Sequence, residues 1–219
     1  MIDIKNLSEI INNEPKFEIF FDKLIEANQK FNLTSITQKD EVFLKHFLDS
    51  ITASQYIPNN AYILDIGCGA GFPSIPLKII RPDLKFLLVD SSLKKLGFVD
   101  DLITAFELSD TKTLHTRIED LKEKDFDCVV ARAVAPLNVL CEYALPFLRL
   151  GGQAVFFKAD AAQEVQQAKH AIKFLGGELL DIVTFDLDGN MRTLILIKKI
   201  AQSPKGYPRS LNKPRKNPL

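Results

Sequence analysis

A run of alternate glycines after an apolar stretch is the part of this sequence with the clearest chemical meaning. Residues 63–73 read Ile-Leu-Asp-Ile-Gly-Cys-Gly-Ala-Gly-Phe-Pro, with glycines at 67, 69 and 71. This pattern predicts a strand, a tight turn and a helix that begins at Pro73, whose fixed φ and missing N–H suit a first helical position. Glycines let the backbone lie close to a ligand, and the N–H groups at a helix start bind polar groups.

The spacing of these glycines indicates the ligand. A dinucleotide-binding turn reads G-x-G-x-x-G, but the sixth position is Phe72 counted from Gly67 and Ser74 counted from Gly69, which disfavours a dehydrogenase. The pattern present is D-x-G-x-G-x-G, beginning at Asp65. It resembles the first motif of the class I S-adenosylmethionine-dependent methyltransferases. That cofactor has no pyrophosphate, so the turn need only admit a methionine tail, a sulfonium and a ribose.

A second acidic residue strengthens this interpretation. Residues 85–90 read Lys-Phe-Leu-Leu-Val-Asp, a short β-rich run that ends in Asp90. A carboxylate at about this distance after the glycines, roughly twenty residues, can accept hydrogen bonds from ribose hydroxyls. The structural alternative is that Asp90 caps the helix expected to begin near Ser91.

Composition and cysteine content limit the class of protein. The chain has 219 residues, 46% hydrophobic and 26% charged, which is typical of one ordinary soluble domain with a small extension. No apolar run approaches the roughly 20 residues that cross a bilayer, and the first residues lack a signal-peptide layout. The three cysteines lie far apart without histidines at metal-ligand spacing. We therefore expect a cytoplasmic protein with no membrane partner, no metal and no disulfide framework.

Hydrophobic periodicity divides the chain into three predicted segments. Helical spacing predicts an N-terminal helical extension at 1–58, and residues 59–200 alternate strands with helices. The last two strands, 178–186 and 193–200, have no helix between them and predict an antiparallel hairpin; residues 201–219 form a basic tail. We therefore expect an α/β, Rossmann-like fold with seven strands, mostly parallel, as in class I methyltransferases. The five parallel strands are expected at 61–66, 85–90, 111–115, 126–131 and 153–158.

The residues after the strand at 126–131 limit the methyl acceptor, because ligands bind at strand carboxyl ends in such sheets. The chain continues Arg132-Ala133-Val134-Ala135, without the Asn/Asp-Pro-Pro-aromatic run usual in enzymes that methylate exocyclic amines. Methylation of pyrimidine carbon five needs a cysteine nucleophile, but Cys128 lies in the strand and Cys141 in a predicted helix. An acceptor with its own lone pair, such as guanine N7, needs neither device, and catalysis then relies mostly on positioning.

Several runs carry a more specific resemblance, which covers nearly the whole chain. They are Asn-Leu-Thr-Ser-Ile-Thr at 32–37, Lys-His-Phe-Leu-Asp-Ser at 45–50, the glycine turn at 65–77, and shorter runs at 90–95, 117–120, 131–133 and 207–209. Together they resemble the bacterial small-subunit ribosomal RNA guanine-N7 methyltransferases, also called the glucose-inhibited division protein B family. The resemblance implies a cytoplasmic enzyme that uses S-adenosylmethionine and methylates one guanine of 16S ribosomal RNA near the decoding region, in the RNA or the small-subunit particle. We expect a monomer.

The cofactor-binding residues follow from these motifs. We expect Gly67, Gly69 and Gly71 to line the methionine half of the cofactor. We expect Phe72, at a family position, to contact the cofactor through its backbone, and Asp90, the acid of the second motif, to bind the ribose. Ile118 and Glu119, after the third strand, should meet the adenine. The alternatives are a core aromatic at Phe72 and a solvated acidic loop at Glu119.

Arg132 is the residue that we expect nearest the acceptor. Its forked donors suit guanine O6, a phosphate or the cofactor carboxylate, so it is our catalytic and cofactor-binding candidate; the alternative is an arginine that satisfies strand-end carbonyls. His46 and Asp49 lie three residues apart on one helix face, and we interpret them first as a hydrogen-bonded pair that docks the N-terminal helices. RNA-binding candidates are Lys158, Arg192 and Arg209.

The charge of the chain is polarised towards its end. No acidic residue follows Asp188, whereas lysines and arginines accumulate, so the basic tail is typical of a polyanion partner. We expect the tail to contact RNA without affecting cofactor affinity; the alternative is a disordered tail that aids solubility. Two alternative functions remain: a small-molecule methyltransferase on the same fold, and a non-catalytic RNA-binding protein of ribosome assembly.

Overall fold

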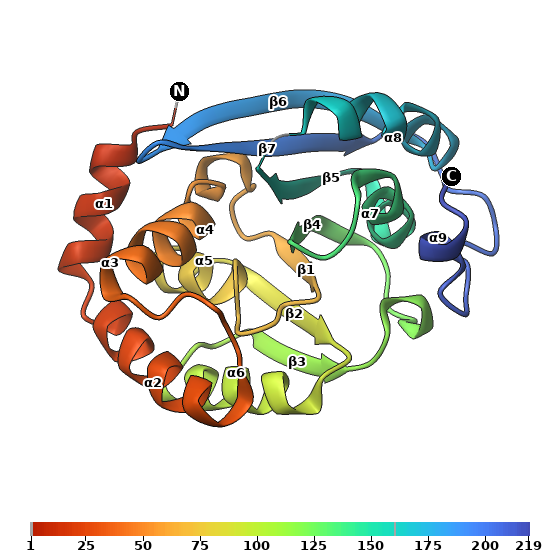
Figure 1. The fold of residues 1–219 in the computed structure, drawn as a ribbon. Helices are drawn as coiled ribbons and strands as arrows, with labels where there is room; N and C mark the ends of the chain where they lie inside the picture. The colour runs from red at the N-terminus through yellow and green to blue at the C-terminus, as the bar shows by residue number, and fades with distance from the viewer. Residues whose placement is uncertain (1, 160) are drawn as a thin grey trace.

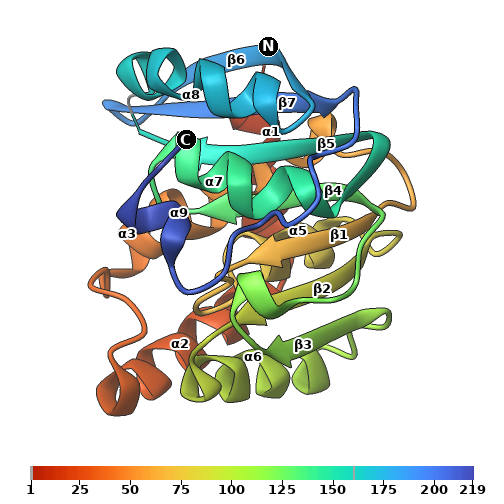
Figure 2. The same cartoon turned by 90° about the vertical axis from the view of Figure 1, so that its right-hand side faces the viewer.

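The computed structural model describes residues 2–159 and 161–219, which form a seven-stranded sheet with helices on both faces (Figure 1, Figure 2). The strand order is β3-β2-β1-β4-β5-β7-β6. The strands are β1 Tyr62–Ile66, β2 Lys85–Asp90, β3 Thr111–His115, β4 Phe126–Arg132, β5 Leu148–Lys158, β6 Gly177–Leu187 and β7 Asn190–Lys199. Strands β1 to β5 pair in parallel and β7 pairs antiparallel with both β5 and β6. The predicted mostly parallel sheet with a C-terminal hairpin is confirmed.

The helices divide between the two faces of the sheet (Figure 1). One face carries α1 Ile4–Asn13, α2 Lys16–Phe31, α3 Lys39–Val42, α4 Asp49–Ile51, α5 Ser74–Ile80 and α6 Leu93–Ala105. The other face carries α7 Leu137–Ala144, α8 Ala162–Phe174 and the short α9 Lys213–Lys216. Shorter turns are the π-helical η1 Phe43–Leu48 and the 3-10 segments η2 Ser54–Tyr56, η3 Ile118–Asp120 and η4 Leu145–Phe147.

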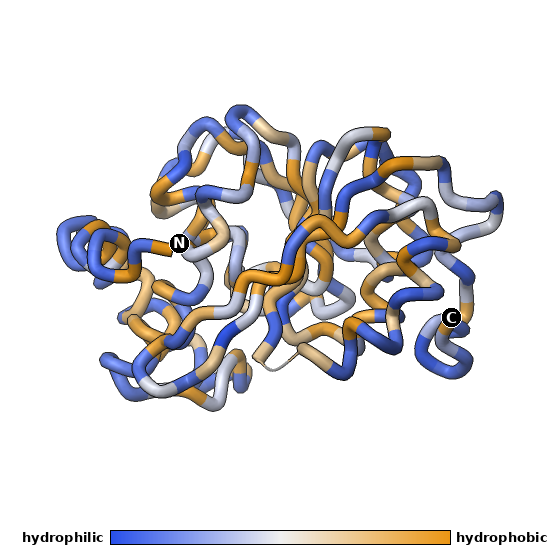
Figure 3. The backbone as a smooth tube through the Cα atoms, turned by 90° about the horizontal axis from the view of Figure 1, so that it is seen from above, coloured by the Kyte–Doolittle hydropathy of each residue, from blue (hydrophilic) through white to orange (hydrophobic). Residues whose placement is uncertain are grey.

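Two hydrophobic cores follow from the period of two in the strands. Ile63 and Leu88 point into the core under α1–α6, whereas their neighbours Leu64 and Val89 point into the core under α7 and α8. Strands buried on both faces therefore read as continuous apolar runs. Figure 3 shows hydrophobic residues gathered along the central strands and hydrophilic ones on the outside.

The N-terminal helices share the first of these cores with the sheet. Phe20 of α2 stacks on Phe72 of the glycine turn, with ring centroids 5.2 Å apart, and Phe47 of η1 packs against the same two rings. Aromatic pairs of this kind stabilise the packing by about 0.5–1.5 kcal/mol each beyond their buried area. The helical segment before β1 is thus packed directly against the turn that follows β1.

Local details differ from the sequence expectations. Within the predicted helical extension, the helical segment at 39–51 is interrupted by the π-helical η1. Pro73 precedes α5 at its N-cap instead of occupying its first position. The tail at 201–219 is docked on the second face, with Pro214 buried and Leu219 packed against that core. The alternative of a disordered tail is therefore wrong.

Candidate functional site

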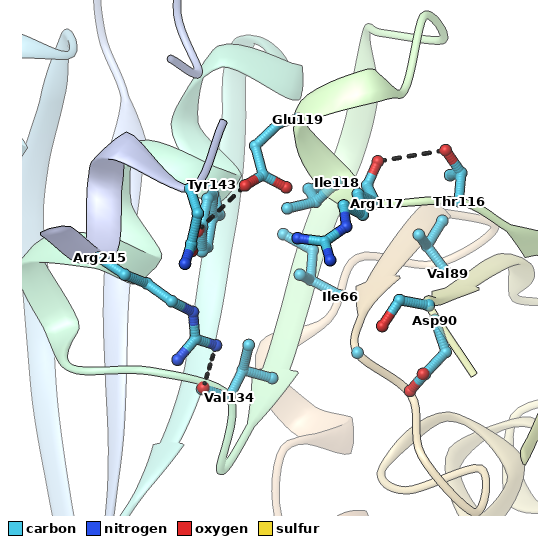
Figure 4. A pocket seen from close by; sticks show the side chains of 13 residues that line it. Ile66, Val89, Asp90, Thr116, Arg117, Ile118, Glu119, Val134, Tyr143 and Arg215 are labelled. Atoms are coloured by element: carbon cyan, nitrogen blue, oxygen red, sulfur yellow. Dashed lines mark hydrogen bonds between the residues drawn. The ribbon is translucent and has the colours of Figure 1, made fainter. Parts of the chain in front are cut away.

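A cavity of about 210 Å³ opens at the carboxyl ends of the parallel strands (Figure 4). Its walls come from the ends of β1, β2 and β3, from the turn after β4, from α7 and from the tail. Four of the expected cofactor residues line it, namely Gly67, Asp90, Ile118 and Glu119. Gly69, Gly71, Phe72 and Arg132 lie outside this lining. The topology therefore brings half of the sequence-predicted site together in one place.

The glycine turn fits a close ligand at its first two glycines. Gly67 has φ +67°, and a Cβ there would lie 3.0 Å from Val134 Cγ2, so a side chain would crowd the cavity wall. Gly69 has φ +57° with no heavy atom nearer than 4.0 Å to a Cβ at that position. Positive φ is the region that favours glycine. Gly71 instead packs on Ile75 in the core, where a Cβ would approach to 2.6 Å.

Asp90 joins the glycine turn to the start of α6. Its Oδ2 accepts from the Gly69 N–H at 3.0 Å, which holds the turn, and its Oδ1 accepts from the Ser92 N–H at 2.8 Å, at the start of α6. Each carboxylate oxygen has two lone pairs, so acceptor capacity for ribose hydroxyls remains. The helix-capping alternative and the ribose expectation are therefore compatible.

Asp65, the first residue of the motif, stays away from the cavity. Its buried Oδ2 accepts from Ser74 Oγ at 2.6 Å, tying β1 to the start of α5. Its Oδ1 has no hydrogen-bond partner among the described residues. Burial raises the pKa of Asp65 to about 7, because removal from water disfavours the charged form. Asp65 therefore stabilises the conformation of the glycine turn.

The end of the cavity where we expect the adenine is built by η3 and α7. Ile118 is buried and gives an apolar surface, and Glu119 Oε1 accepts from Tyr143 Oη at 3.4 Å. Figure 4 shows both residues above Ile66, across the cavity from Asp90. The described cavity also includes residues that the sequence did not single out as cofactor contacts, which are Thr116, Arg117, Tyr143, Asn212 and Arg215. Among these, Arg117 had a sequence signal through the run at 117–120, and Arg215 had one through the basic tail.

Arg132 lies at a second cavity of about 200 Å³, on the other side of the turn that follows β4. Its Nη1 donates to Asp49 Oδ2 at 3.1 Å, and its guanidinium lies 5.0 Å from the Phe72 ring centroid. Arg192 approaches the other Asp49 oxygen, with Nε 3.6 Å from Oδ1. Burial raises the pKa of Asp49, and the two arginines oppose this shift. The cavity thus holds a buried carboxylate between two cations.

His46 and Asp49 are linked through Arg132. The described contacts contain no bond between the two side chains; His46 Nε2 meets Thr34 Oγ1 at 2.8 Å and its Nδ1 lies 3.4 Å from Arg132 Nη2. Burial and, second, the charge of Arg132 lower the His46 pKa to about 4. The predicted direct pair is therefore wrong, although both residues do join the N-terminal helices to β4.

Phe72 places its side chain in the core. The ring lies between Phe20 and His46, with the centroid of the His46 ring 4.7 Å away. The backbone N–H of Phe72 donates to Cys68 O at 3.1 Å. The core-aromatic alternative accounts for this side chain. A cofactor contact would have to use the remaining backbone carbonyl, and it stays a prediction.

Two of the RNA-binding candidates are engaged internally. Lys158 Nζ donates to Ala135 O at 2.8 Å and pairs with Glu164 Oε2 at 2.7 Å. Arg209 forms a fork on the buried Glu142, with Nε to Oε1 at 2.8 Å and Nη2 to Oε2 at 2.6 Å. Arg209 therefore anchors the tail to α7, and its geometry offers no support for an RNA contact.

The fold and the first cavity define the class of protein. A seven-stranded sheet of this order, with a glycine turn after β1 and an acid at the end of β2 on one cavity, is that of the class I S-adenosylmethionine-dependent methyltransferases. An O-methyltransferase from Thermotoga maritima shares the fold at TM-score 0.56 and 15% identity, over 83% of this chain and 73% of that one. TYW2 from M. jannaschii, solved in complex with AdoMet, matches at TM-score 0.57 and 15% identity, over 69% and 77%.

Sequence comparison gives the particular family. The family model described as "rRNA small subunit methyltransferase G" (GidB) matches residues 13–194, and this chain belongs to that family. A relative of that name from Bacillus cytotoxicus is 46% identical over 93% of this chain and 90% of its own length. Another, from Bacillus thuringiensis, is 43% identical over 100% and 96%. The predicted family, methyltransferase activity and S-adenosylmethionine cofactor are confirmed.

Residues 2–159 and 161–219 contain neither a cluster of metal-ligating side chains nor a helix that could span a membrane. No group of three or more histidine, cysteine, aspartate or glutamate side chains is placed to hold a metal ion. No helix in these ranges is long and apolar enough to cross a membrane.

Proposed function

We propose that this chain transfers a methyl group to N7 of one guanine of 16S ribosomal RNA near the decoding region. It would act in the cytoplasm, as a monomer, on the RNA or on the small-subunit particle. The relatives carry the printed name of a small-subunit ribosomal RNA methyltransferase. The observation that carries the acceptor proposal is the Arg132 cavity, which adjoins the cofactor cavity and presents cationic donors at the end of β4.

The first cavity would hold the cofactor, and the second would hold the acceptor guanine. The residues of the first fit the cofactor, because Gly67 leaves a wall without a side chain, Ile118 is apolar, and Asp90 and Glu119 are acceptors for hydroxyl and amine donors. Val134 lines the first cavity and Ala133 the second, so the turn after β4 separates them. Ala133 has φ +57°, a strained conformation for a non-glycine residue that is typical of functional sites. We propose that the methyl group crosses at this turn.

Methylation of guanine N7 requires the protein mainly to position the cofactor and the guanine. When bound, S-adenosylmethionine would supply a methyl group whose bond to sulfur breaks as the guanine N7 lone pair forms the new bond, so that S-adenosylhomocysteine leaves and N7 loses no proton. Arg132 can donate to guanine O6, in the manner of arginine on the O6/N7 edge. His46, with its pKa of about 4, is neutral at pH 7 and needs no proton-transfer role. Burial raises the pKa of Cys128 and Cys141, which argues against a thiolate nucleophile.

RNA contacts would come from the second cavity and, separately, from the tail. Arg192 lies at the edge of this cavity, and the tail adds exposed lysines at 205, 213 and 216. Lysines on a surface bind phosphates without reading sequence. We further propose the division into a helical extension at 1–58, a methyltransferase domain at 59–200 and a basic tail at 201–219, with the extension holding Arg132 through Asp49.

Radiolabelled methyl transfer tests this function. Small ribosomal particles from cells that lack the protein should accept one methyl group per particle, and mapping should place it on N7 of a single guanine. Naked 16S RNA and particles from cells that contain the protein serve as the comparison and the control. Transfer to small metabolites with none to RNA would instead favour a small-molecule methyltransferase. Absence of all transfer, with RNA still bound, would favour a non-catalytic assembly protein.

A further inference from the structure

The end of the tail forms part of the cofactor cavity. Asn212 and Arg215 line it together with Gly67, Asp90 and Ile118, although they follow β4 by about eighty residues in the chain. Figure 4 shows the Arg215 guanidinium on the side of the cavity opposite Asp90, beside Tyr143. The sequence predicts a tail that contacts RNA and leaves cofactor affinity unchanged, and this geometry points elsewhere.

Several contacts hold this part of the tail in place. The Arg209 fork on Glu142 joins it to α7, and the Arg209 backbone N–H donates to the same carboxylate at 2.9 Å. The Glu142 side chain is 1% exposed, so the pair is shielded from water and from salt. Arg209 Nη2 also donates to Asn217 O at 2.9 Å, which closes the loop around α9. The tail is therefore fixed on both sides of Arg215.

Arg215 is itself oriented by the wall of the cavity. Its Nη2 donates to Val134 O at 2.8 Å, in the turn that separates the two cavities. Val134 in turn is the residue nearest to a Cβ built at Gly67. A guanidinium has five N–H donors in a plane, so one bond to Val134 leaves both a flat face and further donors. An exposed arginine held in this way is suited to a planar ligand.

We infer that Asn212 and Arg215 belong to the cofactor site and that Arg215 packs against the adenosine half of S-adenosylmethionine. The inference rests on the proposed placement of the ribose at Asp90 and of the adenine at Ile118 and Glu119. Arg215 faces this part of the cavity from the tail side, where the adenine would lie between it and Ile118. A guanidinium stacked on a planar π system binds it by cation–π attraction.

This arrangement couples cofactor binding to docking of the tail. Because the docked tail completes the binding site, a bound cofactor stabilises the docked tail by the same free energy. Release of the tail, for instance by loss of the Glu142 anchor, must then weaken cofactor binding. The tail thus has a second role besides any contact with RNA.

Calorimetric binding of S-adenosylhomocysteine to the full chain tests the inference. Arg215→Ala should weaken binding by about five- to ten-fold. Lys216→Ala removes the same charge one residue away, outside the cavity lining, and should leave binding unchanged. Equal losses in both variants would show a general charge effect and overturn the inference, as would unchanged binding in Arg215→Ala. Binding by the wild type is measured separately, as is RNA methylation, so failure of the proposed function is distinguishable.

Two further measurements locate the contact. With 5′-methylthioadenosine, which lacks the amino acid portion, Arg215→Ala should lose the same factor; a loss confined to S-adenosylhomocysteine would place the cation on the carboxylate and overturn the adenosine assignment. Glu142→Gln should weaken cofactor binding and speed trypsin cleavage of the tail, and S-adenosylhomocysteine should slow that cleavage in the wild type. Tail cleavage that is insensitive to the cofactor would contradict the coupling. Thermal unfolding checks that each variant is folded.

Discussion

Arg132 Nη1 lies 3.1 Å from Asp49 Oδ2, and this ion pair joins the carboxyl end of β4 to the N-terminal helices. The two side chains are 14% and 7% exposed, so the pair is largely desolvated. Loss of one partner of such a pair leaves a buried charge without compensation, which is costly. The candidate for contact with the acceptor is therefore also a structural link, and experiments on it must separate the two roles.

Arg132→Ala is expected to lower single-turnover methylation about ten- to a hundred-fold, because one charged hydrogen bond in a partly dry site contributes about 1.5–3 kcal/mol. It should also lower the free energy of unfolding by at most about 3–5 kcal/mol, because the buried Asp49 would keep only the longer contact with Arg192, at 3.6 Å. Arg132→Lys should recover only part of the activity, since an ammonium lacks the fork. Rapid-quench assays with saturating RNA and urea unfolding measure the two effects.

The double variant Arg132→Ala, Asp49→Asn provides the control. Removal of the buried negative charge should recover part of the stability lost in Arg132→Ala but none of the methylation. If the double variant regains both, Arg132 acts only through the fold. Wild-type turnover in Arg132→Ala would remove it from the site.

His46 should make stability depend on acid pH. Its pKa is lowered to about 4 in the folded chain, chiefly by burial, from a usual 6.5. The unfolded chain therefore binds more protons between these values, so this contribution is present above pH 6.5 and lost as the pH falls to about 4. The loss should be on the order of 2–3 kcal/mol in urea unfolding. His46→Gln should flatten this dependence, whereas the exposed His170→Gln should retain it; equal curves for both variants would contradict the assignment.

Gly69→Ala should separate cofactor binding from folding. The nearest atom to a Cβ at Gly69 would be Gly67 O at 4.0 Å, so the change costs mainly backbone strain at φ +57°, about 1 kcal/mol. It would nevertheless point into the turn that we expect to face the methionine half. We expect normal folding with a loss of at least about ten-fold in S-adenosylhomocysteine affinity, equal to 1.4 kcal/mol.

Gly189→Ala is the matched control for that strain. Gly189 has φ +75° with nothing near its Cβ, and it lies in the turn between β6 and β7. It should lose similar stability and keep full affinity in the same calorimetric titration. Unaltered affinity in Gly69→Ala would place the methionine half elsewhere.

The exposed lysines of the tail should govern the salt dependence of RNA binding. Replacement of Lys205, Lys213 and Lys216 by glutamine should flatten the dependence of affinity on salt, because fewer counterions are released. Cofactor affinity should not change, since none of the three lines the cofactor cavity. Filter binding at several salt concentrations measures the slope, and an unchanged slope would assign the RNA surface to another face.

Local patterns in the sequence are sufficient for much of this molecule. The sequence predicts all seven strands, but the signal differs between them. The central strands β1, β2 and β4 are buried on both faces and leave a continuous hydrophobic signal, whereas the edge strands β3 and β6 are largely exposed. Gly67 and Asp90 are predictable because the backbone geometry of a turn and the position of an acid after a strand follow from local chemistry. Ile118 and Glu119 are placed correctly on the cavity for the same reason, since each follows a strand of known order in a known fold.

Contacts between distant segments are decided only in the tertiary structure. Arg132 and Asp49 are separated by 83 positions, and no local pattern predicts that they pair, or that His46 reaches Asp49 only through the arginine. In the same way, Arg209 meets Glu142 across 67 positions and so carries Arg215 into the cofactor cavity. Local sequence determines the glycine turn and the strand-end acids, because each is built within a few residues. Packing of remote segments determines which charges are buried and which surfaces close the site, because burial depends on neighbours that only the folded chain supplies.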